Sequence, residues 1–199
     1  VNGTESKKNR AINTFKIAIV NFNPSIFHRT FDDLAKSLSL RQIFLEIFIP
    51  LLNEIGILWQ TISINPVHLN FLSGILKEKL YMNIALEDKK LSISKEKLYV
   101  LFLPENEIDE LGILFINYEL RLRNQRTIFI SPGLAMKELH KLVEIHSSPV
   151  FVSYLNETQG EILEFVREFE SEISRGSSQE LLLVGTNVQF FNPMQLIQM

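Results

Sequence analysis

The sequence contains no cysteine, which excludes disulfide bonds, thiolate metal ligands and cysteine nucleophiles. The lack of cysteine also fits a reducing compartment, and we expect a cytoplasmic protein. The sequence has fewer basic than acidic residues, with 20 Lys and Arg and 23 Asp and Glu, which gives a net charge of −3. A chain of this charge has no broad basic field with which to hold nucleic acid by itself.

Long uninterrupted apolar runs are also missing. The most apolar stretch, residues 43–59, is broken by polar residues and by Pro50, whereas a membrane-spanning helix needs about 20 consecutive apolar residues. We therefore expect no contact with a membrane. The first residues, 1–10, read VNGTESKKNR and lack the apolar core of a signal peptide. We expect this segment to be a linker or a vector-derived remnant.

The familiar motifs of catalysis and cofactor binding are absent. There is no GxGxxG, P-loop, HExxH or GxSxG pattern. The histidines lie far apart in the sequence, and no nucleophile has an adjacent base. We therefore predict that the chain is not an enzyme and that it has no catalytic residue and no metal site.

The N-terminal part of the chain has a helical pattern. Apolar residues make up 46% of the sequence, which is enough for a globular core. Across residues 11–86 they recur at helical spacings, and Asn-Pro pairs mark two of the helix starts. We predict a four-helix bundle, with helices over 11–22, 25–38 and 39–60 and a last one from Asn65-Pro66. Pro50 should kink or split the third helix.

A charged segment, residues 87–97, is predicted to be a linker to a second domain at 98–199. Beyond it, strand and helix patterns alternate. The predicted strands are Leu98–Leu103, Thr127–Ser131, Val150–Tyr154 and Leu181–Gly185, and the predicted helices are Ile108–Asn124, Ala135–His146 and Gly160–Arg175. Repeated βα units favour a flavodoxin-like, doubly wound parallel sheet, so the fold class is α plus α/β. The tail after Asn187 could be a fifth strand or a terminal helix.

The loop after the first predicted strand is acidic. The strand ends at Pro104, and Glu105, Glu107, Asp109 and Glu110 follow it. Doubly wound proteins bind ligands at such strand ends. A Mg²⁺ site like that of receiver domains is disfavoured, because those domains need an Asp after the third strand. The alternative is a solvated helix entrance, where acids also favour the helix dipole.

Two stretches, residues 49–76 and 101–131, resemble the C-terminal half of MerR-type cobalamin-responsive transcriptional regulators. The resemblance implies a helical cap over the upper face of cobalamin and a Rossmann-like domain under its lower face. It also implies a DNA-binding domain earlier in the chain, which is absent here, and a homo-oligomer. DNA would then be a partner only through that missing domain.

The cobalamin motif of this family has three blocks, acid-x-His-x-x-Gly, Ser-x-Leu and Gly-Gly. Glu107–Gly112, Ser153–Leu155 and Gly185-Thr186 lie at the matching positions, and Trp59 matches an aromatic residue of the cap. The cofactor-binding positions that the resemblance implies, some of them vestigial, are Trp59, Leu69, Asn70, Glu107, Asp109, Gly112, Ser153, Leu155 and Gly185.

The residues that would face cobalt depart from the family. Asp109 stands where the family has the lower-face histidine, and Leu69-Asn70 stands where the cap has Glu-His. A carboxylate is a harder donor than imidazole and suits low-spin cobalt poorly. We therefore expect no bound cofactor, although cobalamin is the ligand of the family.

Several of these residues have a second, purely structural interpretation. Trp59 either lines an upper-face pocket or is a core aromatic, and Ser153 either contacts a nucleotide-like tail or is a satisfied hydroxyl at a strand end. Gly185 either lets a ligand tail approach or makes a tight turn. Asp109 is either an acid in a repurposed pocket or a residue at a helix start.

Three functions remain open. The first is the regulatory module of a MerR-type regulator that no longer uses cobalamin and acts through oligomerisation or another effector. The second is a working sensor of cobalamin or of another small molecule. The third, which the missing histidine disfavours, is a corrinoid-binding methyltransferase component.

Overall fold

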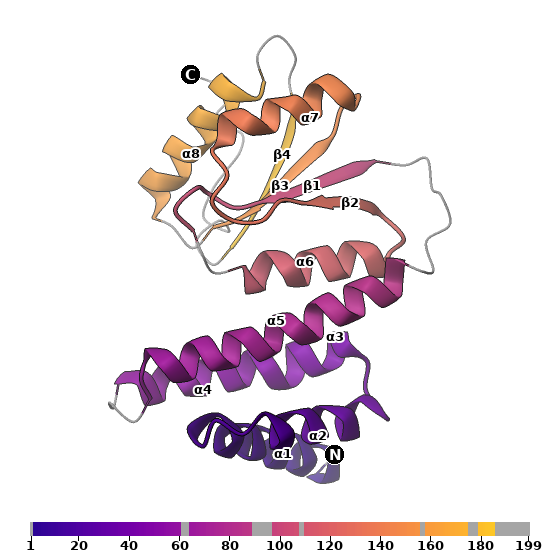
Figure 1. The fold of residues 1–199 in the computed structure, drawn as a ribbon, viewed down its shortest axis with the longest axis vertical. Coiled ribbons are helices and arrows are strands. Elements are labelled where there is room, and N and C mark those ends of the chain that lie inside the picture. Colours follow the sequence, from indigo (N-terminus) through magenta and orange to yellow (C-terminus); the bar gives the residue numbers. More distant parts are fainter. Residues whose placement is uncertain are drawn as a thin grey trace. The chain divides into compact units, whose positions relative to one another are not determined.

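The computed structural model describes residues 2–60, 64–88, 97–107, 110–155, 158–174 and 179–185, arranged in two compact units that divide at Asn83 and Ile84 (Figure 1). The first unit is helical and the second is a four-stranded parallel sheet flanked by helices. This is the α plus α/β class that the sequence predicts.

The helical unit consists of α1 (Asn2–Val20), α2 (Pro24–Ala35), α3 (Leu40–Ile43), η1 (Phe44–Phe48), α4 (Ile49–Gln60) and most of α5 (Pro66–Asp88). Helix α1 begins earlier than the sequence indicates, since residues 2–10 are helical where we expected a linker. Two ion pairs, Lys8–Glu46 and Lys16–Glu54, join α1 to the apolar helix beside it. These contacts between residues far apart in the sequence explain why its polar residues are helical.

Aromatic rings fill the core of the helical unit. Phe15 lies with its ring centroid 4.4 Å from that of Phe27 and 5.6 Å from that of Phe48. The Phe48 ring also contacts the rings of Phe31 and Phe44. On the outside of this cluster, the buried ammonium of Lys79 lies 4.9 Å from the centroid of Phe31. The phenylalanines thus tie α1, α2 and η1 into one core.

The predicted break at Pro50 takes the form of a π-helical turn. The amide of Ile49 donates to the carbonyl of Phe44, the wide spacing of a π-helix, directly before Pro50. Proline lacks the donor that an α-helix needs and crowds the carbonyl four residues earlier, so a wider turn relieves both problems. The stretch Leu40–Gln60 is long and apolar enough by composition to cross a membrane, a test that core helices also pass.

The second unit contains β1 (Leu98–Phe102), α6 (Leu111–Leu122), β2 (Arg126–Phe129), η2 (Met136–Leu139), α7 (His140–Ile145), β3 (Val150–Tyr154), α8 (Gln159–Glu172) and β4 (Glu180–Val184). All strand pairs are parallel, in the order β2-β1-β3-β4. The chain therefore leaves β1 toward one side of the sheet and continues from β3 toward the other. That change of direction defines the switch point between β1 and β3.

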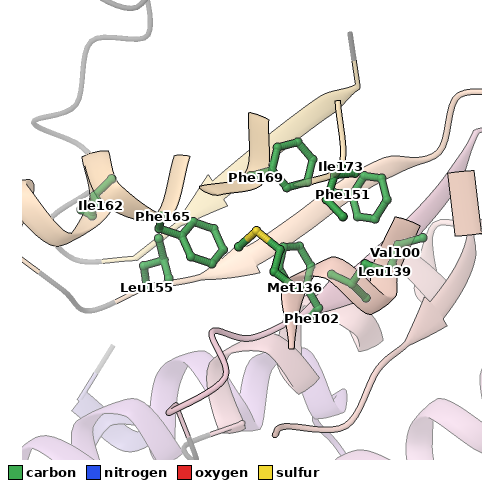
Figure 2. Close-up of a cluster of buried hydrophobic side chains, with 10 residues drawn as sticks. All are labelled: Val100, Phe102, Met136, Leu139, Phe151, Leu155, Ile162, Phe165, Phe169 and Ile173. Atoms are coloured by element: carbon green, nitrogen blue, oxygen red, sulfur yellow. The ribbon is translucent and has the colours of Figure 1, made fainter. Parts of the chain in front are cut away.

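Helices cover both faces of the sheet, with α6 on one face and α7 and α8 on the other (Figure 1). Alternate residues of each strand supply the two cores. On the α8 side, Phe102 and Phe151 pack against Phe165 and Phe169 (Figure 2). The predicted linker 87–97 falls mostly on residues 89–96, which lie outside the described residues, as do the predicted tail elements after Asn187.

Candidate functional site

The three motif blocks of the second unit meet at the carboxyl edge of the sheet. Phe102 at the end of β1 pairs in register with Ser153 on β3, and Ser153 pairs with Leu183 on β4. The turn after β1 closes with the Glu107 amide donating to the Pro104 carbonyl over 3.0 Å. The three blocks therefore lie at the same edge of the sheet, beside the switch point. Asp109 itself lies outside the described residues.

Gly112 lies in the first turn of α6, directly against the ring of Tyr154. A β-carbon built on Gly112 would lie 2.8 Å from three ring atoms of Tyr154. Contacts that short do not occur between real β-carbons and aromatic rings, so a side chain at this position would have to displace the ring. The space beside Gly112 is therefore filled by the side chain of Tyr154. The pattern Ser-x-Leu does not single out its middle residue, and sequence reasoning missed it.

Gly185 makes a second close contact. Its φ is +155°, and a β-carbon there would lie 1.7 Å from the carbonyl oxygen of Leu155. The Leu155 amide donates to the Val184 carbonyl over 2.8 Å, which holds the ends of β3 and β4 together. The close approach that Gly185 permits is therefore that of the protein backbone. This contact fits the tight-turn interpretation of Gly185.

Ser153 is fully buried, and its hydroxyl has no hydrogen-bond partner within the described residues. Within the described residues, nothing supplies the partner that the satisfied-hydroxyl interpretation requires. A buried hydroxyl without a partner is costly, by about 1–3 kcal/mol. Ser153 is a predicted site residue whose polar group is fully buried and, among the described residues, unpartnered.

A hollow of about 400 Å³ opens at the same edge, between the loop after β1 and helix α8. Its lining includes the carboxylates of Glu107, Glu161, Glu164 and Glu168. Glu161 accepts hydrogen bonds from the amide and hydroxyl of Thr158, as in a capping box. A wall of carboxylates disfavours a phosphate-bearing tail such as that of cobalamin. No group of three or more metal-ligating side chains was found in the described part of the chain.

The predicted cap positions lie near the last residue of α4 and the first residues of α5. Trp59, near the end of α4, is 41% exposed, so the core-aromatic interpretation of Trp59 is wrong. Leu69 is half-buried and Asn70 exposed, both in the first turns of α5. His68 beside them stacks on Phe22, with ring centroids 4.4 Å apart, and its Nδ1 lies 2.8 Å from Asn65 Oδ1.

A comparison with known protein families gives a match for the helical unit. Residues 11–82 match the family model described as a B12 binding domain. The match covers the helical unit and includes Trp59, Leu69 and Asn70. A search of curated proteins found no match.

The helical unit is therefore a cobalamin-binding-like cap, and a Rossmann-like domain follows it in the chain. This is the architecture that the resemblance implies, with the cobalamin-binding-like match confined to the helical unit. At the lower site, the protein's own atoms lie against both motif glycines. Tyr154 fills the space beside Gly112, the Leu155 carbonyl fills the space at Gly185, and the nearby hollow is acidic.

Proposed function

We propose that this chain is the regulatory module of a MerR-type transcriptional regulator that has lost cobalamin binding. It acts through oligomerisation or through another effector, in the cytoplasm and without enzymatic activity. DNA is contacted by a domain that precedes this module in the full-length protein. The observation that carries the loss of cobalamin is the contact between Tyr154 and Gly112, which fills the site with the protein's own ring.

The closed site is consistent with the changes at the cobalt-facing positions. Asp109 replaces the lower-face histidine, and Asn70 replaces a histidine of the cap. A carboxylate in place of imidazole weakens coordination to low-spin cobalt. Loss of the ligand set and closure of the space are independent changes, and each alone lowers the affinity for cobalamin.

The direct test is to incubate the protein with cobalamins, desalt it and record its visible spectrum. We expect no retained corrinoid. Stoichiometric retention would overturn the proposal that cobalamin binding is lost. The double variant Asp109→His/Asn70→His restores both imidazoles, and we expect no gain while Tyr154 remains. The control Asp32→His adds a histidine on the exposed face of α2.

A triple variant that adds Tyr154→Ala separates the two causes. If the ring closes the site, the triple variant should retain more corrinoid than the double variant. Retention by the double variant alone would show instead that the missing imidazoles were the whole obstacle. Circular dichroism of each variant establishes that it is folded, so that a lack of binding is informative.

The oligomeric part of the proposal rests on exposed apolar side chains of the cap. Ile57, Val67 and Met82 are each more than half exposed, at 62%, 61% and 55%. Exposed apolar groups that gather in one patch are typical of surfaces that other proteins cover, whereas single ones are common on monomers. Light scattering coupled to size exclusion should find a dimer or larger oligomer. A monomer at every concentration tested would contradict self-association of this module.

A sensor of a small molecule is the second candidate. The unpartnered hydroxyl of Ser153 favours it, because a buried polar group without a partner is common where a ligand supplies one. In that case Ser153→Ala should weaken binding of the effector while leaving the fold intact. If Ser153→Ala only stabilises the protein, the hydroxyl serves no ligand.

A further inference from the structure

A second hollow, of about 550 Å³, lies at the opposite, amino edge of the sheet. Its lining comes from the first residues of all four strands and from the turn before β3. Lys97 and Leu98 precede or begin β1, Arg126 begins β2, and Glu180 begins β4. The strands of a parallel sheet all run the same way, so this hollow is separated from the motif blocks by the length of the sheet.

The charge of this hollow differs from that of the acidic one. Its lining holds two permanent cations, Lys97 and Arg126, and the imidazole of His146, against the carboxylate of Glu180. Lys97 Nζ donates to Glu180 Oε2 over 2.9 Å, and this hydrogen bond raises the pKa of Lys97. The carboxylate of Glu180 is therefore engaged by Lys97, while the charge of Arg126 remains uncompensated there.

Arg126 is exposed, and its guanidinium has no hydrogen-bond or ion-pair partner among the residues that the structure describes. A guanidinium presents several N–H donors in a planar fork that matches phosphate and carboxylate oxygens. Its position at the first residue of β2 is set by the sheet, since Arg126 pairs in register with Leu98 of β1. The donor is thus mounted on a rigid element next to Lys97.

The turn before β3 adds hydroxyl donors. Ser147 and Ser148 line the hollow, and neither hydroxyl has a hydrogen-bond partner within the described ranges. Ser148 has a φ of +56°, a left-handed conformation that costs a residue other than glycine about 1 kcal/mol. Pro149 follows directly and limits the backbone of the turn further. The turn thus adds two hydroxyl groups to the same lining as the two cations.

We propose that the amino-edge hollow binds a phosphate group of a small molecule, with Arg126 as its main charged contact. Lys97 and the serine hydroxyls complete the donor set. The volume of the hollow exceeds that of a single oxyanion, so it has room for the organic part of a phosphomonoester or for a pyrophosphate. Such a ligand is one that this module could sense independently of the cobalamin-like edge. The proposal does not depend on whether cobalamin binding is lost.

Calorimetric titration with inorganic phosphate, pyrophosphate and glycerol phosphate tests this assignment at fixed ionic strength. We expect binding that chloride at the same ionic strength does not produce. Arg126→Gln should weaken it about fivefold or more, because a charge-assisted contact is lost. Lys137→Gln is the control of equal charge change, on the exposed side of η2. Equal losses of phosphate affinity in Arg126→Gln and Lys137→Gln would mean that only the net charge matters, and would overturn the site.

A gain-of-affinity variant makes the test sharper. Glu180→Gln removes the carboxylate of the lining and releases Lys97, so phosphate should bind several-fold more tightly. Glu164→Gln, an exposed residue of α8 that lines the acidic hollow instead, makes the same charge change and should not tighten it. No heat with any phosphate probe, or binding of a short DNA duplex without binding of the small phosphates, would overturn the proposal. Circular dichroism of every variant establishes that it is folded.

Discussion

The carbonyl oxygen of Leu155 lies where a side chain on Gly185 would begin, since a β-carbon there would be 1.7 Å away. The contact joins the ends of β3 and β4, the second and third blocks of the motif. Glycine is therefore required at this position by the fold itself, with or without a ligand.

Gly185→Ala should destabilise the α/β unit by about 3 kcal/mol or more, because φ near +155° is unfavourable for alanine and the clash is with backbone. The chain has one tryptophan, Trp59 in the helical unit, so its fluorescence follows that unit alone. We expect the far-ultraviolet circular dichroism transition to shift while the Trp59 transition stays unchanged. Gly160→Ala is the control, with no atom within 4 Å of its β-carbon. A Gly185→Ala protein as stable as the parent would contradict the contact.

The contact between Gly112 and Tyr154 predicts a change of sign in a double-mutant cycle. In an open helix, Gly→Ala stabilises by up to about 1 kcal/mol. Here the alanine methyl meets the Tyr154 ring, so Gly112→Ala alone should destabilise the unit. In a Tyr154→Ala background the same change should become neutral or stabilising, for a coupling of about 1–3 kcal/mol. Denaturant unfolding measures all four proteins. If the effects of the two substitutions on the free energy of unfolding were additive, the Tyr154 ring would not contact Gly112.

A matched glycine provides the reference for that cycle. Gly74 lies within α5 and has no atom within 4 Å of its β-carbon. Gly74→Ala should therefore show the uncomplicated helix preference. If Gly74→Ala and Gly112→Ala shifted stability equally, the Tyr154 contact would carry no energy.

The strands and the order of the elements could be predicted from the sequence. Buried parallel strands are apolar runs that stand apart from their polar surroundings, and Val150–Tyr154 was predicted with its observed bounds. The motif spacing likewise predicts which residues meet at the carboxyl edge. The spacing of the motif blocks puts each block at the carboxyl end of a strand, and in a doubly wound sheet these strand ends lie at one edge.

The closure of the site could not be predicted in this way. Whether Tyr154 points to solvent or lies on Gly112 depends on the packing of α6 against β3, which has no local signature. The exposure of Trp59 and the helical state of residues 2–10 likewise depend on contacts between residues far apart in the sequence. Lys8 is paired with Glu46, for example, and neither residue indicates this pairing by itself.

A polar network joins β2 to α6, and removing its hydrogen bonds should lower the free energy of unfolding without changing the fold. The Thr127 hydroxyl donates to Asn117 Oδ1 over 2.6 Å and accepts from Arg121 Nε over 2.6 Å. Thr127→Val keeps the volume but removes both hydrogen bonds, so it should cost about 1–3 kcal/mol. Hydrogen exchange of the β2 and α6 amides should accelerate. Thr14→Val, at a partly exposed position of α1, is the control and should stay within about 0.5 kcal/mol.

The aromatic core of the cap predicts the largest effect of a single substitution in the helical unit. Phe48 is 1% exposed, and its ring contacts those of Phe15, Phe27, Phe31 and Phe44. Phe48→Ala should cost about 3–5 kcal/mol, because it leaves a cavity among rings that cannot collapse onto it.

Ile17→Ala is the matched control for Phe48→Ala, since Ile17 is 56% exposed in helix α1 of the same unit. Ile17→Ala should change stability by no more than about 0.5 kcal/mol. Trp59 fluorescence follows both variants in denaturant, because the tryptophan lies in the same unit. A Phe48→Ala transition that coincides with that of Ile17→Ala would mean that the ring is not buried in a packed core. The cap would then be a looser assembly that packs only when a partner or a second copy covers it.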